Sequence, residues 1–290
     1  MTLFDLTAGP FLEFAFMRRA LAACLALSLG CGPVGVLLVL RRMSLMGDAM
    51  SHAVLPGAAI GFLAAGLSLW AMGIGGFLAG LAVALLAGLV SRVTALREDA
   101  SFAAFYLISL AGGVLIVSLR GSNVDLMHVL FGTILAVDDA GLLLVAGIAT
   151  VTLLTLALLY RPMVLECFDS GFLRAVGGAG GRLGAACHLV FLVLVVLNLV
   201  GGFQALGTLM AVGLMMLPAV SARLWHAMLP AQLLNSALQA MAAGYAGLLL
   251  SFHFDLPSGP VIIMCAGALY GASLLCAPQG WLGRRRRQRS

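Results

Sequence analysis

The sequence has 290 residues, of which 62% are hydrophobic and 9% charged, and its formal charge at pH 7 is +5. A soluble domain carries about a quarter charged residues, so this composition cannot cover a water-facing surface, whereas lipid tails solvate apolar side chains directly. We therefore predict an all-α polytopic membrane protein, a helical bundle. All 16 Lys and Arg positions are Arg, and without Lys the chain lacks the phosphate-binding motif of an ATPase. It is accordingly predicted not to be an enzyme, and any ATP that drives it is hydrolysed by another polypeptide.

Apolar runs that approach the roughly 20 residues needed to cross a bilayer occur about nine times. They cover residues 17–40, 53–71, 73–91, 100–119, 140–160, 185–202, 205–222, 228–251 and 258–277. We expect a tight hairpin around Met72 and, because Pro218 interrupts the seventh run, either a kink or a pair of half-helices there. Residues 1–16 are predicted to be an interfacial segment, 17–277 the transmembrane domain and 278–290 a basic tail.

Arginine positions predict the orientation of these spans. They lie in alternate loops and in the tail, which makes that side cytoplasmic and places the N-terminus outside. Arg18 and Arg19, at the start of the first span, do not fit this pattern. The tail could suggest nucleic acid, but after an apolar helix it is better interpreted as a topology signal. The arginines on the predicted cytoplasmic side are Arg41, Arg42, Arg92, Arg97, Arg161, Arg174, Arg182, Arg223, Arg284–Arg287 and Arg289.

Residues 41–57 contain the most informative pattern in the chain. Asp48 and His52 are four residues apart and share one face of a helix. An ionisable pair at the start of an apolar span is a functional hypothesis by default, and a carboxylate beside an imidazole suits zinc, manganese or iron. A structural hydrogen-bonded pair at the membrane boundary explains the same spacing. The glycine pairs Gly57/Gly61, Gly76/Gly80 and Gly267/Gly271 indicate closely packed helices.

Other candidate ligands have simpler explanations as well. Met43, Met46 and Met50 could bind copper(I), but packing against lipid or helices is favoured. Asp125 and His128 follow the fourth span and could receive metal, although capping and packing explain them equally well. A turn explains His253 and Asp255 better than metal binding does.

The largest predicted cytoplasmic loop, residues 161–184, carries a different signal. Asp169 or Ser170 is a suitable N-cap, a short helix can follow to Val176, and Gly177 ends it. A short polar helix in this loop is where we expect an ATPase partner to bind and transmit its movement. Cys167 is expected to lie in the loop, just before this helix.

Seven motifs lie at residues 41–57, 97–99, 125–132, 168–177, 204–207, 217–219 and 253–260. Together they resemble the bacterial zinc/manganese/iron-chelate ABC permease family. The resemblance covers essentially the whole chain and implies a homodimeric permease with a cytoplasmic ABC ATPase dimer and an extracytoplasmic metal-binding protein. It implies metal coordination by Asp48 and His52, and ATPase coupling through the segment that contains Phe168, Asp169, Leu173, Arg174 and Gly177. No resident cofactor is implied, since the divalent metal is the cargo.

The predicted function is therefore metal import across the bacterial plasma membrane. The motif sequences look most like those of the zinc importers, and manganese is the next candidate substrate. The ligand types tolerate zinc, manganese and iron alike. The main alternative is a stand-alone proton-coupled metal carrier that uses Asp48 and His52. An intramembrane metalloprotease would need His-Glu-x-x-His on a helix, which the sequence lacks.

Overall fold

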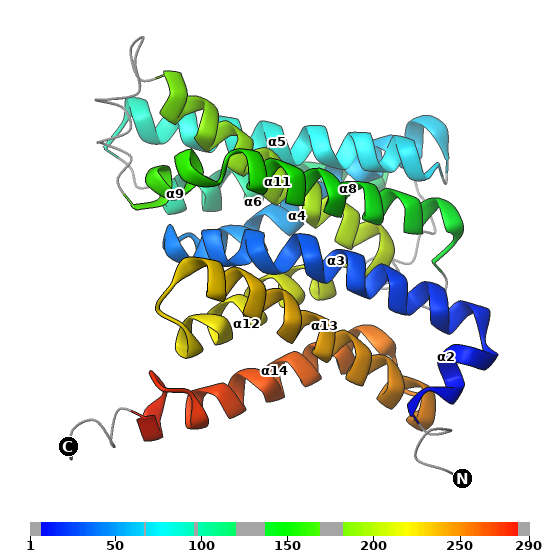
Figure 1. Ribbon diagram of the computed structural model, residues 1–290. Helices are drawn as coiled ribbons and strands as arrows, with labels where there is room; N and C mark the ends of the chain where they lie inside the picture. The colour runs from blue at the N-terminus through cyan, green and yellow to red at the C-terminus, as the bar shows by residue number, and fades with distance from the viewer. Residues whose placement is uncertain (1–6, 67, 96–97, 120–136, 169–181, 284–290) are drawn as a thin grey trace.

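The computed structural model describes residues 7–66, 68–95, 98–119, 137–168 and 182–283, and every regular element in these ranges is an α-helix (Figure 1). The helices are α2 (Gly9–Glu13), α3 (Ala15–Leu40), α4 (Ser44–Ala65), α5 (Leu69–Val93), α6 (Glu98–Leu119), α8 (Asp139–Leu158), α9 (Tyr160–Phe168), α11 (Arg182–Leu206), α12 (Thr208–Trp225), α13 (Leu229–Phe254) and α14 (Ser258–Cys276).

Helix lengths confirm the membrane prediction. In the part of the chain that the structure describes, 8 helices are long and apolar enough to cross a bilayer, and α6 adds a shorter apolar stretch, Ala100–Ile116. The expected boundaries of the second span were wrong, because α4 already begins at Ser44 and the break before α5 falls at residues 66–68, not at Met72. Pro218 lies inside a continuous α12, so the pair of half-helices is absent.

Helix α3 forms the centre of the bundle. In Figure 1 it runs between an upper group, α4, α5, α6, α8 and α11, and a lower group, α12, α13 and α14. It packs against members of both groups and is the most completely buried of the spans. The outer helices instead expose large apolar side chains such as Leu143, Leu158 and Met264, which a bilayer solvates.

Glycines let α4 and α5 pack backbone against backbone. A Cβ atom at Gly57 would overlap the carbonyl oxygen of Gly75, and one at Gly61 would overlap that of Ala71. The two backbones therefore touch, as small residues at four-residue spacing allow in lipid. Gly76 and Gly80 also pack against neighbouring side chains, as their spacing predicted, whereas no atom lies within 4 Å of the Cβ positions at Gly267 and Gly271.

A buried polar contact joins three helices in the interior. The side-chain amide of Asn198 on α11 donates to Thr152 Oγ1 on α8 at 2.8 Å and to the Leu194 carbonyl oxygen at 2.9 Å. The Cys31 thiol of α3 lies 4.0 Å from the Asn198 amide oxygen. Such interhelical hydrogen bonds are worth about 1 kcal/mol in membranes and fix helix register.

Contacts at one end of the bundle agree with alternating spans, because they join the starts of α3 and α8. Arg19 Nε at the start of α3 lies 3.4 Å from Asp139 Oδ1 at the start of α8. Arg18 donates to the carbonyl oxygen of Leu12 at 2.9 Å. The positive charges of Arg18 and Arg19, which do not fit the charge pattern, are thus partly compensated by the Leu12 carbonyl oxygen and the Asp139 carboxylate. Asp255 adopts a left-handed conformation with φ 53° at the end of α13, as the predicted turn requires, whereas His253 still lies in the last turn of the helix.

The close contact between α4 and α5 gives a first prediction. Gly57→Ala should destabilise the protein by about 1–3 kcal/mol, because the added methyl group must push the two backbones apart. Gly147→Ala on α8 is the matched control, since its Cβ position has no neighbour within 4 Å. Thermal unfolding of both variants in detergent, monitored by size-exclusion chromatography, measures the difference. Equal unfolding temperatures would contradict the contact.

Candidate metal site and coupling region

The candidate metal site lies in the first half of α4. The helix begins after Met43, whose side chain is buried together with those of Met46 and Met50. These thioethers therefore pack in the protein core. Asp48 and His52 lie one turn apart on the opposite side, with Asp48 Oδ1 3.8 Å from His52 Nε2. A carboxylate oxygen and an imidazole nitrogen thus converge within the reach of a single divalent ion.

The exposed stripe of α4 carries both donors. Leu45, Asp48, His52 and Leu55 follow one another at helical spacing along this face. The side chain of Asp48 is 68% exposed and that of His52 34% exposed. Because charged side chains do not face lipid within a span, this face of α4 must border a polar path or another protein surface.

Helix α6 forms one wall beside the site. The ring of Tyr106 lies 6.2 Å from that of His52 with an interplanar angle of 29°. Farther along, Ser109 donates to the carbonyl oxygen of Ala53 at 3.5 Å, and Gly113 lets α6 approach the ring of Pro56. The sequence analysis missed Tyr106, since an isolated tyrosine in an apolar run carries no motif.

One chain supplies an incomplete coordination set. No group of three or more His, Cys, Asp or Glu side chains able to hold a metal ion occurs within the described ranges. Asp48 and His52 therefore form a two-donor site, whereas structural zinc sites use about four ligands. Asp125 and His128 lie outside the described residues, so the structure does not place them relative to α4.

The predicted coupling loop begins with a helix that the sequence analysis did not anticipate. Helix α9 spans Tyr160–Phe168, and it contains Cys167, which had been assigned to a loop. Phe168 ends this helix with a side chain that is 68% exposed. The other predicted coupling residues, Asp169, Leu173, Arg174 and Gly177, lie outside the described part of the chain, and α11 follows from Arg182.

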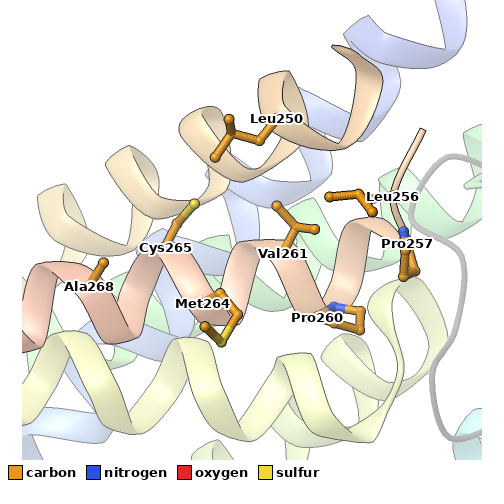
Figure 2. Close-up of a pocket in the computed structure, with 8 residues that line it drawn as sticks. All are labelled: Leu250, Leu256, Pro257, Pro260, Val261, Met264, Cys265 and Ala268. Carbon is orange, nitrogen blue, oxygen red and sulfur yellow. The ribbon is translucent and has the colours of Figure 1, made fainter. Parts of the chain in front are cut away.

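A separate hollow opens between α13 and α14, with a volume of about 450 Å³ (Figure 2). Figure 2 shows its apolar lining, which includes Leu250, Val261 and Met264. Without polar lining groups, this hollow suits acyl chains or an apolar helix surface and does not suit a metal ion.

The apolar spans, together with an exposed carboxylate–imidazole pair on one of them, define a polytopic membrane protein. Comparison with known proteins then assigns the family, because a profile of the ABC 3 transport family matches residues 13–277. The chain belongs to this family, and it is a membrane-spanning permease subunit of the metal ABC transporter type, in which a separate subunit hydrolyses ATP.

Individual relatives match over nearly their full length. The manganese transport system membrane protein MntC of Halalkalibacterium halodurans is 34% identical over 286 residues, covering 96% of this chain and 95% of the relative. The manganese import system permease protein ScaB of Streptococcus parasanguinis is 32% identical over 268 residues, 92% of each chain. The solved structure of PsaBC from Streptococcus pneumoniae in complex with Fab superimposes with a TM-score of 0.84 at 28% identity, covering 100% of both chains.

The contact between Tyr106 and His52 gives a second prediction. Tyr106→Leu removes the ring that packs beside the imidazole and should lower metal uptake about two- to tenfold, the effect of losing an aromatic pair. Tyr106→Phe keeps the ring and should retain the parental rate. Initial uptake rates in cells at matched expression test this, with Tyr270→Leu on α14 as the control. A parental rate for Tyr106→Leu would show that the ring does not orient His52.

Proposed function

We propose that this chain is the permease of a binding-protein-dependent ABC importer for manganese, located in the bacterial inner membrane. The observation that carries the proposal is the Asp48–His52 pair, 3.8 Å apart on the exposed stripe of an apolar helix. Two relatives that match more than 90% of this chain are manganese transport proteins. A carboxylate and an imidazole suit Mn²⁺.

The choice of metal departs from the sequence analysis, which favoured zinc and placed manganese second. Both relatives described above are named for manganese, so zinc lacks specific support. Manganese, zinc and iron(II) all accept oxygen and nitrogen donors. The three ions are therefore compared directly in the experiment below.

A second copy of the chain would complete the site. Asp48 and His52 face away from the core of their own protomer, and lipid cannot solvate them. Around a twofold axis, two such faces would supply two carboxylates and two imidazoles, about four ligands. The remaining proposed partners are a cytoplasmic ABC ATPase dimer and an extracytoplasmic metal-binding protein, with the N-terminus outside and the C-terminus in the cytoplasm.

Metal uptake by site variants tests the proposed function. Asp48→Ala and His52→Ala should each abolish uptake of radiolabelled manganese, because each removes a donor from both copies of the site. Met46→Leu, a volume-conserving change in the core, should stay near the parental rate. Parallel assays with zinc and iron(II) identify the preferred ion.

Two outcomes would contradict the proposal. If both alanine variants take up manganese at the parental rate, the pair is structural and the path lies elsewhere. If the purified chain alone, without any ATPase, accumulates metal in vesicles in response to a proton gradient, the proton-coupled carrier is the correct function.

The coupling region gives a further prediction. Phe168 presents an exposed ring at the end of α9, so Phe168→Asp and Leu173→Asp should each release the ATPase while leaving membrane insertion intact. Co-purification of the ATPase and membrane content of the permease measure the two effects separately. Normal transport with the ATPase still bound would contradict the assignment.

Activity of alkaline phosphatase fused at residue 175 would contradict the cytoplasmic location of the predicted loop 161–184.

A further inference from the structure

Arg41, the residue that follows α3, makes side-chain contacts with two other helices. Its Nε donates to Cys167 Sγ on α9 at 3.3 Å, and its Nη1 lies 2.9 Å from His188 Nδ1 on α11. A guanidinium group only donates hydrogen bonds, so Nδ1 of His188 accepts. The guanidinium carbon also lies 4.1 Å from the ring centroid of Phe191 on α11, within cation–π distance.

The contacts of Arg41 lie on both sides of residues 169–181 and next to the start of α4. Cys167 belongs to the helix that leads into residues 169–181, and His188 to the helix that leads out of them. Arg41 lies three residues before α4 begins, and Asp48 is on the second turn of that helix. One side chain thus connects both flanks of the predicted coupling loop to the start of the helix that carries the metal donors.

The hydrogen bonds of Arg41 to Cys167 and His188 act only at short range. Burial raises the pKa of the Cys167 thiol, although the adjacent Arg41 guanidinium opposes this shift. The thiol is therefore neutral at physiological pH, and its contact with Arg41 is a directional hydrogen bond and not an ion pair. The third nitrogen of Arg41, Nη2, is buried and has no hydrogen-bond partner among the described residues. Directional bonds weaken steeply once they lengthen or bend.

We infer that Arg41 is a positioning residue that couples movement of α9 and α11 to the first turns of α4. This inference rests on the proposed function, because it takes the segment between the two helices as the ATPase contact. When the ATPase displaces the ends of α9 and α11, the guanidinium fork transmits the shift to the α3–α4 junction. Asp48 and His52 then change position relative to α6.

Arg41→Lys is the direct test, in the complete permease–ATPase complex reconstituted in vesicles with its metal-binding protein. Lysine keeps the charge but is a single point donor that cannot hold the Cys167 and His188 contacts together. The number of manganese ions imported per ATP hydrolysed should fall at least about tenfold, the effect of losing a hydrogen bond to a charged group. Basal ATP hydrolysis and ATPase binding should persist. Arg223→Lys, exposed in the last turn of α12, is the matched control.

A second pair of variants keeps the inference testable if Arg41→Lys does not fold. His188→Asn places an amide oxygen near the position of Nδ1 and should retain at least half of the parental ratio. His188→Leu removes the acceptor and should match Arg41→Lys. Combining Arg41→Lys with His188→Leu should cost no more than either change alone, because both break one connection.

The outcomes separate cleanly. An unchanged ratio for Arg41→Lys, or equal losses for His188→Asn and His188→Leu, would overturn the coupling role. Loss of ATPase binding together with a lower unfolding temperature in both Arg41→Lys and His188→Leu would also overturn it, since Arg41 would then be structural. Failure of the proposed function is distinct, because the parental complex itself would then import no manganese.

Discussion

Charged side chains within a bilayer must face a polar partner, and this constraint governs the arrangement around α4. Asp48 and His52 occupy the one stripe of the helix that the protomer leaves open. The opposite side is fixed by buried Met46 and Met50 and by backbone contact with α5. The packed side of α4 therefore fixes the helix, and Asp48 and His52 face a neighbouring surface or a water-filled path.

The same contacts determine which parts of the bundle can move together. Because Gly57 and Gly61 bring α4 onto the backbone of α5, we expect the two helices to move as a pair. Toward α6 the contacts are looser beside His52, with a ring pair at 6.2 Å and one hydrogen bond at 3.5 Å, than at Pro56, where Gly113 packs closely on the ring. A change of access to the proposed metal site would thus occur most easily beside His52, at the part of α6 that contains Tyr106.

Sequence patterns predicted most of the spans and the shared helix face of Asp48 and His52, because hydropathy and helical spacing are local properties. They misplaced the start of α4, where polar residues lower the mean hydropathy to 1.2, the smallest value among the described spans. They missed α9, a helix too short and too polar to resemble a span. The contacts of Arg41 join residues 126 and 147 positions apart, and no local periodicity encodes them. Tyr106 was missed for the same reason.

The central position of α3 has a consequence for biogenesis. Among the described spans α3 is synthesised first, yet neighbours such as α8, α12 and α13 begin at residue 139 or later. At about 5–20 residues per second, the ribosome needs on the order of ten seconds to supply them. During that interval the surface of α3 that is finally buried must be solvated by lipid. Its one serine, Ser28, donates to the carbonyl oxygen of Cys24 in its own helix at 2.7 Å. The hydroxyl of Ser28 is therefore satisfied within α3 before the neighbouring helices are inserted. The buried surface of α3 must therefore be compatible with lipid as well as suited to packing.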